Sequence, residues 1–122
     1  MQVSKQKVNP TLEKQLYRMW GQLIADIKFP AEADKISESI FSTTELLTII
    51  KRLGVAYWLS KGRSYENIKQ NLKVSSATIA SIQQELKKPG WKLALEKVMA
   101  EEWASKWEEK IKNLFKRDQS KN

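Results

Sequence analysis

Cysteine and histidine are both missing from the 122 residues of the chain. Their absence excludes disulfides, thiolate nucleophiles, zinc sites built on Cys or His, and the usual general base at neutral pH. The close carboxylate pairs at 101–102 and 108–109 are neighbours on an expected helix. Adjacent helical side chains diverge by about 100°, so neither pair converges on one site. We therefore expect no enzyme activity, no cofactor and no metal site.

Long apolar runs are also missing. No window approaches the roughly 18 apolar residues that cross a bilayer, and residues 1–10 lack the apolar core of a signal peptide. We therefore expect a cytoplasmic protein with no membrane partner. Glycine and proline are scarce, at four and three residues, so long structureless loops are not expected. The length suits one compact domain.

The positive charge is unevenly distributed along the chain. The formal net charge is +8. Residues 61–90 hold six basic and two acidic side chains, so this quarter of the chain carries +4, half of the excess. A focused basic patch favours a polyanionic partner, with nucleic acid first and an anionic membrane surface second. A merely solubilising surface is the alternative interpretation.

Apolar residues recur at spacings of three and four, and no segment has the alternation of a strand. The sequence predicts an all-α fold of about six helices, with a single domain at 11–116 between a flexible arm at 1–10 and a flexible tail at 117–122. The first helix is expected to begin with Thr11 as N-cap and to end before Pro30. Further helices are expected over 30–41, 43–61, 65–72, 76–88 and 91–115.

Two of these segments carry apolar residues beyond an ordinary amphipathic stripe. The helix that follows the capping-box spacing of Ser42 and Glu45 is apolar around most of its circumference, so it must be buried centrally or shared with a partner chain. The last helix carries Trp91, Trp103 and Trp107 at helical spacing. Core or interface packing is favoured over an aromatic ligand cage for these side chains.

The sequence of residues 64–88 predicts a helix-turn-helix. Ser64 and Ser75 are suited to N-cap its two short helices, and the apolar seam has the spacing of two helices that cross steeply. The outer face of the second helix is small at its start and polar towards its end, as a major groove requires. The side chains of this face, Ala77, Ala80, Ser81 and Gln84, are the expected base contacts. The expected phosphate contacts are Lys61, Arg63, Ser64, Lys69, Lys73, Ser75 and Lys88.

The run LSKGRSYENIKQNLKVSSATIASIQQEL resembles the DNA-binding region of the Trp repressor superfamily, most closely in Lys61–Tyr65 and Ser75–Ala80. The resemblance implies an intertwined homodimer that places two recognition helices in successive major grooves. It also implies base contacts for Ser76, Ala77 and Thr78. The residues that hold the tryptophan corepressor in the founding repressor do not carry over. Gly54 and Ser81 stand where that protein has two arginines, and Ile82 replaces a pocket glycine. Tryptophan is therefore not expected as the corepressor, and the effector, if any, is unknown.

These observations predict a homodimeric, sequence-specific double-stranded DNA-binding protein and transcriptional regulator that reads the major groove with the helix at 76–88. Two alternatives stay open. The chain could be the DNA-binding component of a transposase or recombination system, with catalysis supplied by another subunit. It could instead be a helical protein-interaction module that uses its apolar third helix and its Trp-rich last helix.

Overall fold

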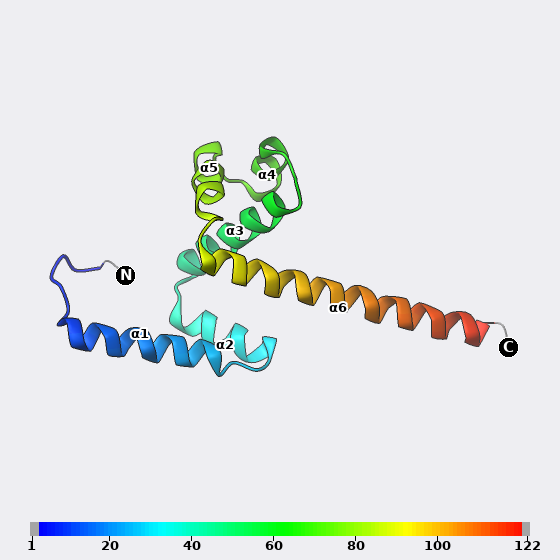
Figure 1. The fold of residues 1–122 in the computed structure, drawn as a ribbon, viewed down its shortest axis with the longest axis horizontal. Helices are drawn as coiled ribbons and strands as arrows, with labels where there is room; N and C mark the ends of the chain where they lie inside the picture. The colour runs from blue at the N-terminus through cyan, green and yellow to red at the C-terminus, as the bar shows by residue number, and fades with distance from the viewer. Residues whose placement is uncertain (1–2, 121–122) are drawn as a thin grey trace. The chain divides into compact units, whose positions relative to one another are not determined.

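A computed structural model describes residues 3–120, except for the side chains of residues 115 and 117–120. Over this range the chain forms six α-helices and no strand, so the predicted all-α class is confirmed (Figure 1). The chain divides into two compact units, residues 1–46 and 47–122, with the boundary inside the third helix. No helix in the described range combines the length and apolarity that crossing a membrane requires.

The first unit contains α1 (Pro10–Ala25), α2 (Pro30–Ile40) and the start of α3. Asn9, and not Thr11, is the N-cap of α1: its side-chain oxygen accepts from the amides of Thr11, at 2.9 Å, and Leu12, at 3.4 Å. Proline at the first helical position accounts for the earlier start, because Pro10 has no amide that needs a partner there. Neither α1 nor α2, both fully described, contains a buried residue.

The second unit contains most of α3 (Thr43–Ser60), followed by α4 (Tyr65–Leu72), α5 (Ser76–Glu85) and α6 (Pro89–Ser120). The predicted capping box opens α3: the Ser42 amide donates to the Glu45 carboxylate at 2.8 Å, and the Glu45 amide donates to the Ser42 hydroxyl at 3.1 Å. These bonds lower the pKa of Glu45. Gly62 follows the helix with φ +78°, a conformation that glycine adopts without strain.

The boundaries of α5 and α6 differ from those predicted. The helix that was expected to reach residue 88 ends at Glu85, and α6 begins at Pro89 instead of residue 91. Proline disfavours the α region for the residue before it and is well suited to the first position of a helix. Pro89 therefore both separates the two helices and starts the second. At its other end, the backbone of α6 is helical through Ser120, beyond the predicted limit at 115. Of the predicted arm and tail, residues 1–2 and 121–122 lie outside the described residues.

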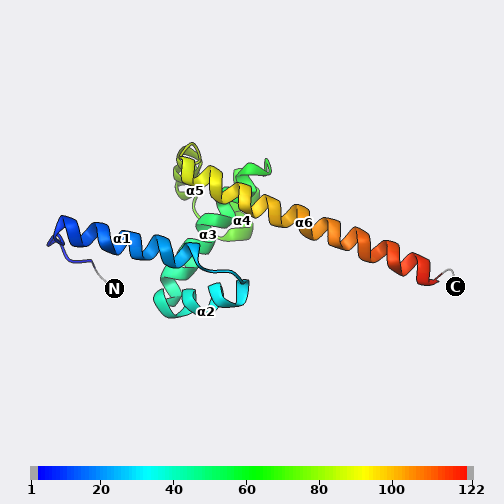
Figure 2. The ribbon, with the colours of Figure 1, turned by 60° about the horizontal axis from the view of Figure 1, so that its bottom comes forward.

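The core of the second unit lies where α3, α4 and α5 meet. Among the described residues, five apolar side chains are buried, all at or below 2% exposure: Val55, Ala56, Ile68, Ile79 and Ile82. Trp91 and Leu95, in the first two turns of α6, pack against this cluster. Beyond these turns, α6 continues as one straight helix past the helix-turn-helix, as two views of the ribbon agree (Figures 1 and 2).

Candidate nucleic-acid interface

The helix-turn-helix is formed by α4, α5 and the three residues between them. Both predicted N-caps are present: the Ser64 hydroxyl accepts from the Asn67 amide and the Ser75 hydroxyl from the Thr78 amide, each at 3.1 Å. Lys73 ends α4 in the left-handed conformation, with φ 55° and ψ 52°. The turn therefore takes the geometry that glycine often supplies, but with a lysine in its place.

The relative position of α4 and α5 is set by buried side chains and by one polar contact. Ile68 of α4 and Ile79 and Ile82 of α5 are fully or almost fully buried in the shared core. At the rim, the Tyr65 hydroxyl donates a hydrogen bond to the side-chain oxygen of Gln83. This contact was not predicted, because nothing in the sequence pairs two polar side chains that are 18 positions apart.

The face of α5 opposite the core carries the residues that were expected to contact bases. Ser76, Ala77, Thr78, Ser81 and Gln84 are exposed on one helix, whereas Ala80 is half-buried. The Thr78 hydroxyl lies 2.9 Å from the Ser75 hydroxyl, so it takes part in the cap at the start of the helix. The exposed surface is thus small at the N-terminal end and gains a long amide side chain, Gln84, at the C-terminal end.

The residues that were expected to contact phosphates are all exposed. In the sequence they lie just before, within and just after the two short helices. They are Lys61, Arg63, Ser64, Lys69, Lys73, Ser75 and Lys88. Lys69 lies on α4 itself, whereas the other cations lie in the segments that lead into and out of the two short helices. Lys88 falls outside α5 because that helix ends at Glu85, and its ammonium is 4.0 Å from the Glu85 carboxylate.

Lys61 has an anionic partner on α6. Its ammonium lies 3.0 Å from the Glu102 carboxylate, which also lies 3.4 Å from the Lys106 ammonium. The pKa of Glu102 is lowered to about 2. The larger cause is a hydrogen bond from the Tyr57 hydroxyl, and the second is the bond from Lys61. The same hydrogen bond raises the pKa of Tyr57, and the bond with Glu102 raises the pKa of Lys61. The charge of Lys61 is therefore partly neutralised within the chain.

Arg63, two residues later, has different surroundings. The carbon at the centre of its guanidinium lies 4.2 Å from the centroid of the Trp58 ring, and Nη1 donates to the Asn67 side-chain oxygen at 3.3 Å. Neither neighbour carries a charge. The guanidinium is therefore held in place without an ion-pair partner among the described residues.

Two contacts tie α3 to the helix-turn-helix from the other side. Arg52 pairs with Glu85 at the end of α5 at 3.0 Å, and the Lys51 ammonium donates to the Lys73 carbonyl at 3.4 Å. The Arg52 and Glu85 side chains are 47% and 32% exposed, so solvent weakens this pair. Sequence reasoning missed both contacts because each joins residues more than twenty positions apart.

The resemblance assigns three positions of this chain, Gly54, Ser81 and Ile82, to the corepressor pocket of the founding repressor. A Cβ on Gly54 would lie 3.3 Å from a methyl carbon of Leu72, which is closer than most such contacts. Ile82 is 2% exposed and belongs to the core. Ser81, the second position, is exposed on α5.

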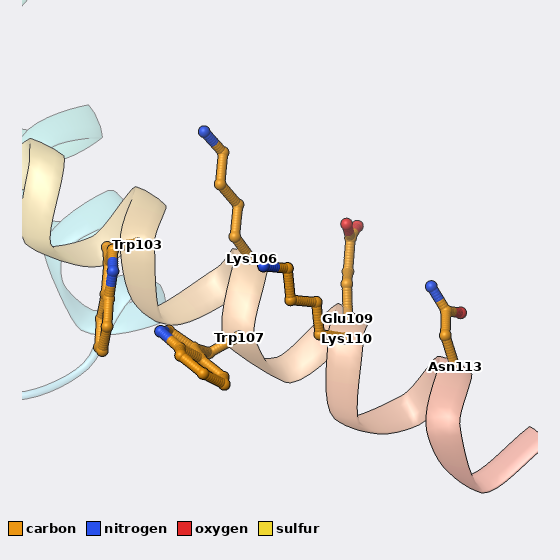
Figure 3. A pocket seen from close by; sticks show the side chains of 6 residues that line it. All are labelled: Trp103, Lys106, Trp107, Glu109, Lys110 and Asn113. Atoms are coloured by element: carbon orange, nitrogen blue, oxygen red, sulfur yellow. The ribbon is translucent and has the colours of Figure 1, made fainter.

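The C-terminal half of α6 carries an exposed apolar stripe of Trp103, Trp107, Ile111 and Leu114, with 64%, 47%, 48% and 60% exposure. The two indole rings meet edge to face with centroids 5.6 Å apart, and Lys110 lies over the Trp107 ring. Figure 3 shows the side chains that line the shallow groove beside them: Trp103, Lys106, Trp107, Glu109, Lys110 and Asn113. Within the described part of the chain, no group of three or more metal-ligating side chains comes together to hold an ion.

Comparison with known proteins supports the interpretation of these elements. Searches of the curated proteins and of the solved structures gave no match. The sequence does match the family model described as Trp repressor protein over residues 15–99, which is more than half of the chain and includes the whole helix-turn-helix. The chain therefore belongs to the Trp repressor family, a family of DNA-binding helix-turn-helix regulators.

Proposed function

We propose that the protein is a sequence-specific, double-stranded DNA-binding transcriptional regulator. It acts as a homodimer in the cytoplasm and reads the major groove with α5, and it does not use tryptophan as its corepressor. The observation that carries this proposal is the division of α5 into two faces. Ile79 and Ile82 are buried against the core, while Ser76, Ala77, Thr78, Ser81 and Gln84 face outwards.

The outer face of α5 suits a major groove in shape and in chemistry. Small side chains at the start of a helix let its backbone approach the base edges closely, and Ser, Thr and Gln offer donors and acceptors to them. Gln84 is the longest of these side chains and is exposed. It is therefore the residue to which we assign most of the base preference, with Ser76, Ala77, Thr78, Ala80 and Ser81 as the closer contacts.

The cations around α5 are assigned to the DNA backbone. In helix-turn-helix proteins the first helix crosses the backbone while the second lies in the groove. Arg63, Ser64 and Lys69 lie at or on the first helix, α4, and Lys73 and Ser75 lie in the turn. Lys61 and Lys88 are weaker candidates, because each lies within 4.0 Å of a carboxylate of the same chain.

The apolar surface of the chain supports a homodimer. Leu12, Leu16 and Ile24 on α1 are 46–48% exposed, and Ile50 on α3 is 53% exposed. Apolar surface of this extent stabilises a protein only when it is removed from water. A second copy carries the same surface, and a two-fold dimer would present two α5 helices to a two-fold symmetric site.

Tryptophan is an unsuitable effector because the chain lacks the groups that would hold it. A carboxylate ligand is bound most strongly by an arginine fork, and the corresponding positions hold Gly54 and Ser81. The close approach of Leu72 to Gly54 and the burial of Ile82 leave little room beside them. We expect DNA affinity to be the same with and without millimolar tryptophan.

Selection of bound sequences from random duplex DNA at about 100 mM salt, with the molecular mass measured in solution, tests the proposal. We expect a dimer and a pair of two-fold related half-sites about one helical turn apart. Gln84→Ala should relax the base preference at one position of each half-site, whereas Lys69→Ala should weaken all sequences equally. Selection of no sequence above background would refute the proposal.

The same experiment separates the two alternatives. A helical interaction module is favoured by the exposed indoles of Trp103 and Trp107, which lie outside residues 15–99. It would give no selected sequence and would capture a partner protein through α6. A DNA-binding component of a recombination system would bind duplex DNA, but only in company with a catalytic subunit.

A further inference from the structure

We propose that Trp58 is a positioning residue for DNA binding: its indole face holds the Arg63 guanidinium where a backbone phosphate is bound. The inference rests on the proposed function and adds a residue that the face of α5 does not identify. Trp58 lies near the C-terminal end of α3, outside the helix-turn-helix. It affects DNA binding only through the position of Arg63.

Three contacts fix Arg63, and Trp58 supplies two of them. The Arg63 amide donates to the Trp58 carbonyl at 3.1 Å, so the backbone is fixed beside the ring. The guanidinium carbon then lies 4.2 Å from the ring centroid, within the range of a cation–π contact, for which Trp is the best partner. Asn67 accepts from Nη1 at 3.3 Å and limits rotation of the guanidinium plane.

The remaining donors of the guanidinium are available to an anion. Arginine has five N–H donors in a planar fork, and among the described contacts one of them is engaged, with Asn67. A free arginine side chain loses considerable rotamer freedom when it binds a phosphate. Because Trp58 and Asn67 already restrict the side chain, less of that freedom is lost on binding, and the contact is stronger.

Lys61, two residues before Arg63, is a cation of the same segment with a different partner. Lys61 lies 5.5 Å from the centroid of the Tyr57 ring, but its ammonium is paired with the Glu102 carboxylate. Arg63 stacks on a ring with no carboxylate within ion-pair distance among the described residues. Lys61 therefore pairs with a carboxylate of the same chain, whereas Arg63 can pair with an external anion.

A double-mutant cycle with Arg63 provides the test. The affinity of the full-length protein for a selected duplex is measured as a function of salt for the wild type, Trp58→Leu, Arg63→Ala and the double variant. We expect Trp58→Leu to weaken binding to all duplexes by roughly two- to fivefold, the size of an exposed cation–π contact. In the Arg63→Ala background the same change should have no further effect, because the group that it positions is gone.

Two controls separate positioning from packing. Trp91→Leu removes another half-buried indole from the same core. Among the described residues Trp91 makes no cation–π contact, so this variant should leave the affinity unchanged in folded protein. Trp58→Phe keeps an aromatic face and should bind within about twofold of the wild type. If Trp58→Leu does not fold, as judged by circular dichroism, Trp58→Met replaces it, because Met fills irregular apolar space without a ring.

The possible results are distinct. An equal loss of affinity for Trp58→Leu and Trp91→Leu, or a loss that persists in the Arg63→Ala background, would overturn the positioning role. So would wild-type affinity in Arg63→Ala. Each of these leaves the proposed function intact, because the wild type still binds DNA. If the wild type itself binds no duplex, both the proposed function and this inference fail.

Discussion

Lys73 has a left-handed backbone conformation that is unfavourable for a residue with a side chain, and its replacement by glycine should stabilise the protein. Lys73 is the non-glycine residue with positive φ in the described part of the chain, at φ 55° and ψ 52°. An L-residue pays about 1–2 kcal/mol in this conformation because Cβ approaches the following carbonyl. Glycine loses more backbone entropy on folding than alanine does, which costs about 0.5–1 kcal/mol.

The difference between these terms gives the expected size of the effect. Lys73→Gly should raise the free energy of unfolding by about 0.5–1 kcal/mol. The Lys51 ammonium donates to the backbone carbonyl of residue 73, and glycine keeps that carbonyl. With a urea slope of about 2 kcal/mol/M, typical of a small protein, the midpoint should rise by roughly 0.3–0.5 M.

Lys69→Gly is the matched control. It removes the same side chain and charge, but from the interior of α4, where glycine costs about 1 kcal/mol relative to a good helix former. The two variants should therefore change stability in opposite directions while both weaken DNA binding without a change in base preference. All unfolding curves need the same protein concentration, because a dimer is stabilised by mass action. Destabilisation of Lys73→Gly by as much as Lys69→Gly would refute the left-handed turn.

Three further predictions concern the fold. The pKa of Glu102 is lowered to about 2, so the ionised Glu102 contributes fully to the free energy of unfolding above pH 4.5. This contribution is lost as the pH falls from about 4.5 to about 2. Glu102→Gln should flatten the dependence of stability on pH over that range, and an unchanged dependence would count against the Tyr57 and Lys61 contacts. Ser42→Ala should cost about 1 kcal/mol in chemical denaturation by removing the cap of α3, and no loss would contradict the capping box. Ile79→Ala should cost about 2–5 kcal/mol by the same assay, because Ile79 is fully buried, and a loss under 1 kcal/mol would show that the core is not packed as described.

The local features of this fold could be predicted from the sequence because each depends on residues within a few positions. Ser42 with Glu45, Gly62, Ser64 and Ser75 all act where their residue types favour a cap or a helix end. The errors were also local. Asn9 took the place of Thr11 as cap because Pro10 starts the helix, and Pro89 starts α6 as well as ending the segment before it.

The contacts around the candidate interface could not be predicted, because they join residues that are far apart in the sequence. Glu102 and Lys106 have the i,i+4 spacing of a helical ion pair, and that pair is present at 3.4 Å. The contacts of Glu102 with Tyr57 and Lys61 depend on how α6 crosses the end of α3, which no periodicity specifies.

Lys61 and Arg63 follow the end of α3 and have different partners, although both are cations. Lys61 and Arg63 are two residues apart and would be equivalent if charge alone mattered. Lys61 is anchored to Glu102 and so fixes α6 against α3. Arg63 rests on the neutral ring of Trp58 and keeps its charge for an external partner. Since long-range attraction depends on total charge but contact depends on position, the cations of this segment should contribute unequally to binding, with Arg63 contributing more than Lys61.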